Sequence, residues 1–442
     1  MNYEEALQFI HGTLKFGSKL GLQNITELLN RLGNPHMAFP SVHVAGTNGK
    51  GSVTAMTANI LYKAGYKVGM FISPYLERFT ERIQVNFQEI PRDDLARLTG
   101  LVKTKIGEMV RDGYHHPTEF EVVTALGFLY FAEQKIDIAV VEVGLGGRLD
   151  ATNVIHPLVS VITSISYDHM DILGNTLKEI AFEKGGIIKP GVPVVSSPQA
   201  EEAAKVLEEL ARKRNAPYYP VFAEQIRERF SSFREQRFDF RYGEKAYENI
   251  GIHLPGRHQM LNAACALTCI TVLKELGFGI DDSAVRSGMD TTVWPGRLEM
   301  IREKPAVILD GAHNPSGAQT LADAVRLYFP GKKIHLILGV FRDKDVDGVV
   351  KILCSVAAEV TATMSDGPRA TNASELAEIV RKYHSRVEIR PDLREAITAV
   401  MGRLAEEGTD DDILVISGSL HLIGEARTIL LENLYGWSQW NH

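Results

Sequence analysis

A lysine placed among glycines stands near the start of the chain, in the stretch AGTNGKGS at residues 45–52. The three glycines let the backbone wrap closely around the oxygens of a bound anion. The positive charge of Lys50 can neutralise terminal phosphates, and the helix that we expect over 50–64 has an N-terminus that attracts phosphate. The pattern therefore predicts a phosphate-binding loop made of Thr47, Asn48, Gly49, Lys50, Gly51 and Ser52.

The spacing in this loop departs from the usual GxxxxGK[ST] pattern of nucleotide-binding proteins. Val44 stands where the first glycine would be, and Gly51 directly follows the lysine. This departure indicates a variant P-loop. The alternative is an ordinary connection between a strand and a helix, in which the glycines serve only close packing.

Three further polar residues, Ser73, Glu142 and His169, stand at or just beyond the ends of expected strands. Glu142 interrupts an apolar strand, where an unpaired carboxylate is expensive to bury. A bound Mg²⁺ would offset that cost, and its preference for oxygen ligands suits Ser73 and Glu142. His169 is a less usual Mg²⁺ ligand, and on spacing alone an ordinary surface or hydrogen-bonding role is the alternative. Asp168 and Asp171 are rival carboxylates in the same loop.

These residues need a scaffold, and short apolar runs alternate with longer amphipathic segments over the first 214 residues. Runs this apolar are buried on both faces, which is typical of a parallel sheet covered by helices. The expected strands are 41–45, 67–72, 137–143, 158–165 and 192–196. The expected helices are 3–11, 25–32, 50–64, 91–112, 118–134, 176–188 and 199–214. In open sheets of this kind ligands bind outside the carboxyl ends of the strands.

The rest of the chain has a different pattern. Residues 218–254 are alternating and aromatic with a turn at Gly243-Glu244, which favours an antiparallel hairpin region. Helices at 258–276 and 281–290 follow, and Pro295-Gly296 then interrupts regular structure. Beyond this hinge, at about 295–299, the alternation resumes with strands expected at 306–309, 333–338, 358–363, 386–390 and 412–416.

We therefore expect an α/β protein of two domains. Residues 1–295 would form a P-loop-type domain with a mostly parallel sheet and a small antiparallel β region. Residues 299–442 would form a smaller C-terminal domain of Rossmann-like α/β architecture. A length of 442 residues agrees with this division, since one ordinary core does not reach that size.

Composition argues against several classes of protein. The net charge of −7 gives no bulk basic character for binding nucleic acid. The N-terminus lacks the basic start and apolar core of a signal peptide, and no apolar run approaches the ~18 residues of a membrane span. Cys265, Cys269 and Cys354 suggest no disulfide framework, which fits the cytoplasm. A monomer is expected, because no coiled coil or other obvious assembly element is visible.

The stretch GTNGKGS resembles the ATP-binding loop of the Mur ligase superfamily, and more narrowly that of the folylpolyglutamate synthase/dihydrofolate synthase family. Further stretches that are similar to this family follow in order along nearly the whole chain. They are ISPYLERFTERIQV, TEFEVVTALGFLYF, VEVGLGGRLDATNV, SISYDHMDILGNTLKEIAFEKGGIIK, GRHQMLNAACAL, WPGRLE, DGAHNPSGA and SGSLHLIGE. The resemblance implies that residues 1–295 bind ATP and that residues 299–442 are the ligase domain.

The resemblance also implies roles for single residues. The histidine matching His169 holds a second metal ion, so that two Mg²⁺ ions are expected, and the lysine matching Lys184 is carbamylated. Lys189, five residues further on, is the nearby alternative. On local pattern alone, Asp310 either accepts from ribose hydroxyls or only starts a turn. The positions that match nucleotide-binding residues of the family are Asn262, Arg297, Asp310 and His313.

The implied chemistry is that of an ATP-dependent ligase. ATP would phosphorylate a substrate carboxylate, and the amine of L-glutamate would attack the acyl phosphate. Lys50, Lys184 and His313 are the residues expected to take part. The candidates for the general base are His313 and a metal-bound group. The resemblance also implies that residues 341–345, FRDKD, form a loop that faces the cleft.

The acceptor would be a pterin compound, a folate or dihydropteroate. Three stretches could line its site: 17–24, 118–121 and 146–153. Phe120 could stack on the pterin ring or simply belong to the core, and Arg148 could pair with a carboxylate. Ser417 and Ser419 could assist at a glutamate pocket. The expected substrate-binding residues are Thr118, Glu119, Phe120, Arg148, Asp150 and Ser417.

Several activities remain open from the sequence. Tail extension of a reduced folate with glutamate is favoured, and conversion of dihydropteroate to dihydrofolate is an additional or alternative activity. A Mur-type ligase acting on a nucleotide-linked precursor would need an N-terminal domain, for which the loop at residue 46 leaves no room. A P-loop kinase or nucleotide switch, which would not need glutamate, is the alternative of a different class.

Overall fold

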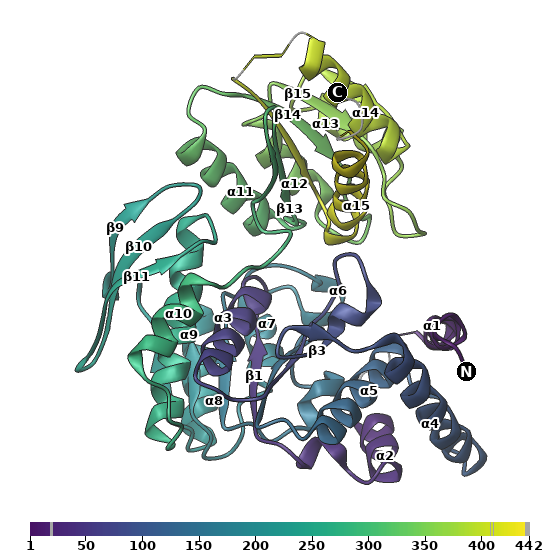
Figure 1. The fold of residues 1–442 in the computed structure, drawn as a ribbon, viewed down its shortest axis with the longest axis vertical. Helices are drawn as coiled ribbons and strands as arrows, with labels where there is room; N and C mark the ends of the chain where they lie inside the picture. The colour runs from purple at the N-terminus through teal and green to yellow at the C-terminus, as the bar shows by residue number, and fades with distance from the viewer. Residues whose placement is uncertain (18–20, 407, 410, 438–442) are drawn as a thin grey trace.

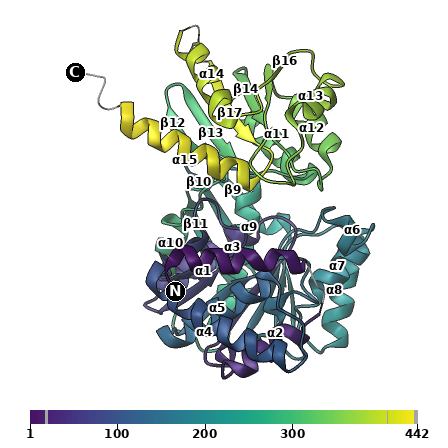
Figure 2. The ribbon, with the colours of Figure 1, turned by 90° about the vertical axis from the view of Figure 1, so that its right-hand side faces the viewer.

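The computed structural model describes residues 1–17, 21–406, 408–409 and 411–437. Figure 1 shows a larger lobe formed by the first two thirds of the chain and a smaller lobe formed by the remainder. Figure 2 shows helix α15 (Leu420–Trp437) on the side of the smaller lobe that faces the larger one. The expected mixed α/β class is confirmed, and the division at about 295–299 stays our proposal.

The larger lobe contains an eight-stranded sheet with the order β4-β3-β2-β5-β1-β6-β7-β8. The strands β2, β5, β1, β6, β7 and β8 pair in parallel with their neighbours. Strands β3 and β4 continue the sheet beyond β2 as antiparallel strands. The strands are β1 (Ser41–Ala45), β2 (Val68–Phe71), β3 (Ile83–Val85), β4 (Gln88–Glu89), β5 (Ile138–Glu142), β6 (Val159–Ile162), β7 (Val194–Ser196) and β8 (Tyr218–Pro220). Every residue of β1, β2, β5, β6 and β7 is buried, so the expected five-stranded parallel core is confirmed.

Helices cover both faces of this sheet, because alternate strand residues pack in opposite directions. One core cluster joins Val42 and Val44 to α3 (Lys50–Lys63), α9 (Arg257–Glu275) and α10 (Asp282–Asp290). The other face is covered by two clusters. Their helices are α1 (Tyr3–Gly12), α2 (Gln23–Arg31), α4 (Arg92–Arg111), α5 (Glu119–Gln134), α7 (Leu177–Gly185) and α8 (Glu201–Lys213). Short helical turns are α6 (Met170–Leu173), η1 (Thr13–Phe16), η2 (Pro35–Met37), η3 (Phe79–Arg82), η4 (Ala151–Val154) and η5 (Ala223–Gln225).

The expected antiparallel region is a three-stranded sheet of β9 (Ile226–Ser231), β10 (Gln236–Tyr242) and β11 (Lys245–Ile252). Gly243 has a φ of 56° in the turn between β10 and β11, as the sequence predicted. The placement of residues 218–220 was wrong, because they form β8 and pair in parallel with β7. Two tyrosines and a proline in so short a strand carry no signal for parallel pairing, which depends on the distant partner Val194.

The smaller lobe contains a six-stranded sheet with the order β12-β13-β17-β14-β15-β16. Five of its strands are parallel, and β12 pairs antiparallel with β13 at one edge. The strands are β12 (Glu299–Glu303), β13 (Ala306–Asp310), β14 (Lys333–Leu338), β15 (Glu359–Ala362), β16 (Val387–Ile389) and β17 (Asp412–Ser417). The helices are α11 (Pro315–Tyr328), α12 (Val346–Cys354), α13 (Ala373–Arg381), α14 (Leu393–Glu406) and α15. The sequence missed β12, since its residues follow directly on the Pro-Gly break and are only partly buried.

No helix in the part of the chain that the structure describes is both long enough and apolar enough to cross a bilayer.

Candidate active site

The loop after β1 has the tight geometry that its glycines allow. Gly46 and Gly49 have positive φ angles of 150° and 90°. Side chains at these two positions would collide with Thr163 and Asn262, so the backbone runs directly against the end of β6 and against α9. Helix α3 begins at Lys50, which places its free N–H groups at the loop. This is the arrangement that binds phosphate at a helix N-terminus.

Lys50 folds back over its own loop. Its Nζ donates hydrogen bonds to the carbonyl oxygens of Gly46 and Thr47, at 3.2 and 3.3 Å. Burial lowers the pKa of Lys50, and the carboxylate of Glu142 works in the opposite direction. The loop therefore holds a partly buried amine beside the N-terminus of α3.

Glu142 ends β5, and its side chain is almost fully buried. The hydrogen bond that the structure gives it is a long one of 3.4 Å, donated by the backbone N–H of Ser73. Burial raises the pKa of Glu142 to about 7, although Lys50 lowers it. A buried carboxylate so poorly compensated is the kind of group that a hard cation stabilises.

The neighbourhood of Glu142 and Ser73 fits a Mg²⁺ ion by the chemistry of its donors, which are a carboxylate and a hydroxyl. Among the described residues, no group of three or more His, Cys, Asp and Glu side chains is arranged to hold a metal. Mg²⁺ commonly keeps several waters and takes one or two carboxylates plus substrate phosphates. The metal roles of Ser73, Glu142 and His169 stay predictions.

His169 lies in the loop after β6, and its Nε2 is 2.8 Å from Nζ of Lys344. The same Nζ donates to Oδ1 of Asp168 at 2.7 Å, and both charged side chains are buried. Burial and the charge of Lys344 lower the pKa of His169 to about 4. Burial would raise the pKa of Asp168, but His313 and Lys344 outweigh it and hold that pKa well below its usual value. Asp168 is therefore a carboxylate shared between the two lobes.

Lys184, near the end of α7, reaches the same loop from another side. Its Nζ donates to the carbonyl oxygen of Gly46 at 2.8 Å, and only 4% of the residue is exposed. Burial lowers the pKa of Lys184 to about 7, with a further contribution from Lys50. Lys189 instead donates to the carbonyl oxygen of Asn153 at 2.8 Å. Of the two lysines, Lys184 is the one in contact with the phosphate-binding loop.

The smaller lobe contributes the residues that follow β13. Both carboxylate oxygens of Asp310 accept backbone N–H groups, from Leu298 and Ala312, each at 2.9 Å. Burial raises the pKa of Asp310, and Arg297 opposes this. His313 lies 3.5 Å from Asp168 across the interface. The structure thus brings Asp310 and His313 to the face of the smaller lobe that meets the phosphate-binding loop.

Two residues at this interface were missed by sequence reasoning, Asn314 and Lys344. Asn314 caps α11 by accepting the N–H of Gly317, and its amide exchanges hydrogen bonds of 3.2 and 3.3 Å with the amide of Asn48. It also donates to Asp168 at 3.0 Å. The cap was visible in the pattern AHNPSG, but the pairing with a residue 266 positions away was not. Lys344 belongs to the FRDKD loop that the resemblance placed at the cleft.

The residues expected to bind substrate lie in two regions, and each of them already has a hydrogen-bonding, ion-pair or packing partner within the protein. Thr118 caps α5 with Glu121, Glu119 lies 3.1 Å from Nδ1 of His11, and the ring of Phe120 packs 6.1 Å from that of Phe71. The substrate roles of these three residues stay predictions, as do those of Arg148, Asp150 and Ser417. Arg148 pairs with Glu183, Asp150 accepts the N–H groups of Leu145 and Thr152, and Ser417 is buried with its Oγ 3.4 Å from the carbonyl of Ala312.

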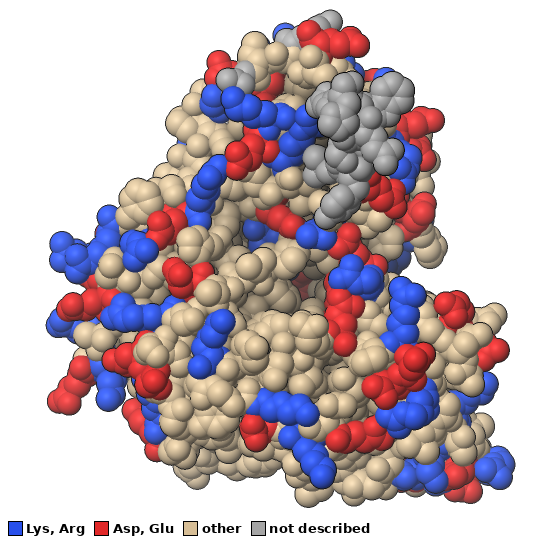
Figure 3. Space-filling model, in the orientation of Figure 1, with Lys and Arg blue, Asp and Glu red and all other residues tan. Residues whose placement is uncertain are grey.

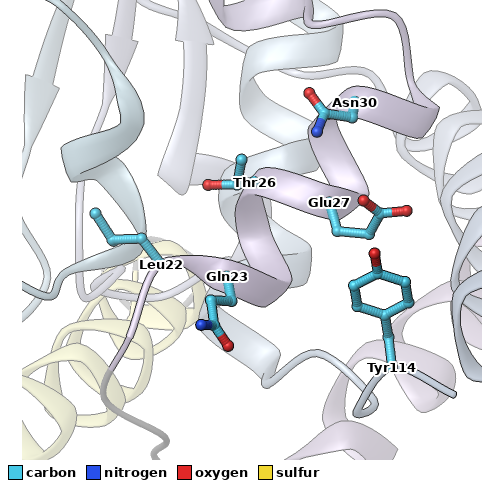
Figure 4. Close-up of a pocket in the computed structure, with 6 residues that line it drawn as sticks. All are labelled: Leu22, Gln23, Thr26, Glu27, Asn30 and Tyr114. Atoms are coloured by element: carbon cyan, nitrogen blue, oxygen red, sulfur yellow. The ribbon is translucent and has the colours of Figure 1, made fainter.

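Two cavities lie beside the stretches expected to line the acceptor site. One is an open surface pocket of about 410 Å³, lined by side chains of α2, the residue before it and Tyr114, as Figure 4 shows. It includes Leu22 and Gln23 from the stretch 17–24, of which residues 18–20 lie outside the described part. The other, of about 80 Å³, is lined by 145–149, Ile172, Leu173 and Glu183. Neither cavity contains the phosphate-binding loop, whose chemistry depends on N–H groups and buried charges.

Charged side chains gather where the lobes meet. In Figure 3 this face of the molecule is hollowed between the two lobes, and both lysine or arginine and aspartate or glutamate side chains border the hollow. Lys344 lowers the pKa of Lys50, and both Lys50 and Lys344 lower that of Lys184. The carboxylates that oppose these shifts are Glu142 and Asp168 at Lys50, and Asp168 and Asp150 at Lys184. Several cations at one junction suit a ligand with several negative charges.

Comparison with known proteins agrees with this geometry. The Mur ligase middle domain matches residues 44–270, and the Mur ligase glutamate ligase domain matches residues 296–420. The dihydrofolate synthase/folylpolyglutamate synthase of Bacillus subtilis is 41% identical over 436 residues, which are 96% of this chain and 98% of that protein.

Solved structures show the same fold. Folylpolyglutamate synthase from Thermotoga maritima is 37% identical with a TM-score of 0.83, and the alignment covers 97% of this chain and 96% of that one. Folylpolyglutamate synthase of Mycobacterium tuberculosis, solved with ADP and AMPPCP, is 33% identical with a TM-score of 0.90, covering 97% and 99%. The chain therefore belongs to the folylpolyglutamate synthase/dihydrofolate synthase family of Mur ligases and is an ATP-dependent ligase.

Proposed function

We propose that the protein joins L-glutamate to the γ-carboxylate of a reduced folate through an acyl phosphate formed from ATP. The observation that carries this proposal is the meeting of a P-loop, the lysines Lys50, Lys184 and Lys344, and a poorly compensated buried glutamate at the junction of two lobes. A water-poor junction of this kind protects an acyl phosphate from hydrolysis. The relatives' names supply the substrate class.

The residues of the site would have separate roles in this reaction. The loop residues from Thr47 to Ser52 would cradle the phosphates of ATP, and Lys50 would turn from its own loop carbonyls to the terminal phosphate. Ser73 and Glu142 would hold one Mg²⁺ and His169 a second. When bound, these ions would screen the negative charge that accumulates as carboxylate and phosphate approach each other. Asn262, Arg297, Asp310 and His313 would hold the nucleotide from the side of the smaller lobe.

Lys184 has the properties that carbamylation requires. A pKa of about 7 leaves a large fraction of its amine neutral at physiological pH, and only the neutral amine has the lone pair that attacks CO₂. The new N–C bond gives a carbamate, and the amine loses one proton to solvent. The resulting anion would replace a cation in a region rich in positive charge, and it would orient the cation at His169.

The acceptor would lie along the edge formed by Thr118, Glu119, Phe120, Arg148 and Asp150. Phe120 would face the pterin ring, and Arg148 would exchange Glu183 for a substrate carboxylate. L-glutamate would bind on the smaller lobe near Ser417. His313, beside Asp168, is our candidate for accepting the proton of the glutamate amine.

A second activity is favoured by a specific observation. The relative from Bacillus subtilis is named for both dihydrofolate synthase and folylpolyglutamate synthase, and the alignment covers nearly all of both chains. We therefore include dihydropteroate as a second acceptor, which would give dihydrofolate. The monomeric state and the cytoplasmic location belong to the same proposal.

The proposal is tested by measuring ADP release with ATP, Mg²⁺ and tetrahydrofolate, with and without L-glutamate. Ligase activity requires release that depends on glutamate and a product larger by one glutamyl residue. Release of equal size without glutamate would identify a kinase or a nucleotide switch instead. Repeating the assay with dihydropteroate decides whether both acceptors are used.

A further inference from the structure

Lys344 connects the two lobes through one buried amine. It lies in the loop between β14 and α12 of the smaller lobe, and 6% of its side chain is exposed. Its Nζ is 2.7 Å from Oδ1 of Asp168 and 2.8 Å from Nε2 of His169, which both belong to the larger lobe. Neither contact has a role in the reaction described above.

The protonation of His169 follows from this contact. A charged lysine amine has three donors and no acceptor, so Nε2 of His169 must accept the hydrogen bond with its lone pair. A metal ion bound to His169 through Nε2 would need the same lone pair. One nitrogen cannot serve both partners, and the two positive charges would also repel each other at this distance.

We propose that Lys344 is a positioning residue that competes with a divalent cation for Nε2 of His169, so that binding of the cation releases this contact between the lobes. The inference rests on the proposed metal role of His169. Before the cation arrives, the amine neutralises Asp168 and holds the lobes together. When the cation binds, the amine of Lys344 leaves His169. Binding of the cation is therefore coupled to the relative position of the two lobes.

Asp168 limits how far the lobes separate when the cation replaces Lys344 at His169. It also accepts from Asn314 at 3.0 Å, and Asn314 in turn pairs with Asn48 of the phosphate-binding loop. Loss of the contact between Lys344 and His169 therefore leaves a connection from Asp168 to the smaller lobe. We expect a rearrangement of the FRDKD loop at the junction rather than full opening of the lobes.

The test measures the cation at His169 directly, in the full chain. Mn²⁺ is titrated into the protein with a non-hydrolysable ATP analogue, and pulsed electron paramagnetic resonance records the modulation that a coordinated imidazole nitrogen produces. In Lys344→Gln, half of the nitrogen signal should appear at a Mn²⁺ concentration about tenfold lower than in the wild type. The reason is that no hydrogen bond from a charged donor has to be given up. Lys344→Arg restores a cation and should return the titration toward the wild-type curve.

The matched control is Arg427→Gln. Arg427 is also a cation at the junction, paired with Glu77 of the larger lobe at 2.6 Å, but it does not contact His169. Its removal loosens the lobes but leaves the amine of Lys344 on the imidazole, so the Mn²⁺ curve should move much less than in Lys344→Gln. His169→Gln identifies the nitrogen signal, which should vanish in that variant.

Three results would overturn the inference. Equal Mn²⁺ curves for the wild type and Lys344→Gln, with the nitrogen signal present in both, would show that the amine does not compete, and would leave the metal role of His169 intact. Absence of the nitrogen signal from every variant would remove both the competition and the proposed metal role. A shift in Arg427→Gln as large as in Lys344→Gln would assign the effect to lobe separation instead.

Discussion

Replacement of Glu142 by glutamine should make the ligand-free protein more stable and at the same time inactive. A pKa of about 7 in place of the ordinary 4.5 corresponds to about 3 kcal/mol of unfavourable free energy once the carboxyl is ionised in the folded chain. Glutamine has nearly the same shape and no charge, so this cost disappears. This pKa already includes the attraction of Lys50. The amide of glutamine has to find hydrogen-bond partners at a buried position, which offsets part of the gain, and we expect a net stabilisation of about 1–2 kcal/mol at pH 8.

The pH dependence of this stabilisation shows whether the charge of Glu142 is its cause. Because the folded-state pKa of Glu142 lies above the unfolded-state value, the folded chain keeps a proton that the unfolded chain has lost between pH 4.5 and about 7. The contribution of Glu142 to stability therefore falls as the pH rises through this window and is constant above it. The advantage of Glu142→Gln should be largest at pH 8 and largely lost at pH 5.

Differential scanning calorimetry in EDTA measures this effect at both pH values. We expect the Tm of Glu142→Gln to exceed that of the wild type by about 1–3 °C at pH 8. Adding Mg²⁺ and an ATP analogue should raise the Tm of the wild type more than that of the variant. An exposed glutamate such as Glu224 provides the control substitution, for which no change is expected. Destabilisation of Glu142→Gln at pH 8 would refute the argument from burial.

Three other substitutions test separate parts of the account. Lys50→Ala should lower the rate of glutamate-dependent ADP release at least about 100-fold, because the terminal phosphate loses its buried cation, and steady-state kinetics would show this. An undiminished rate would remove the P-loop from the mechanism. Phe120→Ala should raise the KM for the pterin substrate much more than that for ATP, and an equal rise in both would indicate a packing role only. Arg427→Gln, which breaks the pair with Glu77, should raise the KM for glutamate severalfold with little change in Tm. An unchanged KM would show that this pair does not help to hold the lobes in their working position.

The local parts of this structure could be predicted from the sequence. Strands β1, β5 and β6 are short, mostly apolar runs, and burial on both faces leaves such runs few alternatives. The tight loop after β1 could be predicted because glycines at fixed positions report backbone geometry. Gly46 and Gly49 do have the positive φ angles that their residue type allows.

Contacts between distant residues could not be predicted in the same way. The pairing of Asn48 with Asn314 and of Lys344 with Asp168 depends on how the two lobes meet. Neither Asn nor Lys in a loop carries a signal for a partner far along the chain. The same limit explains β8 and β12, whose pairing is determined by neighbouring strands and not by their own residues.

Transfer of oxygen from substrate to phosphate tests the central claim most directly. A folate whose γ-carboxylate carries ¹⁸O is incubated with the protein, ATP, Mg²⁺ and L-glutamate, and the released phosphate is analysed by mass spectrometry. If an acyl phosphate forms, one ¹⁸O atom should appear in each phosphate released. Glutamyl product accompanied by phosphate without ¹⁸O would show that the carboxylate is not phosphorylated, and would contradict the account.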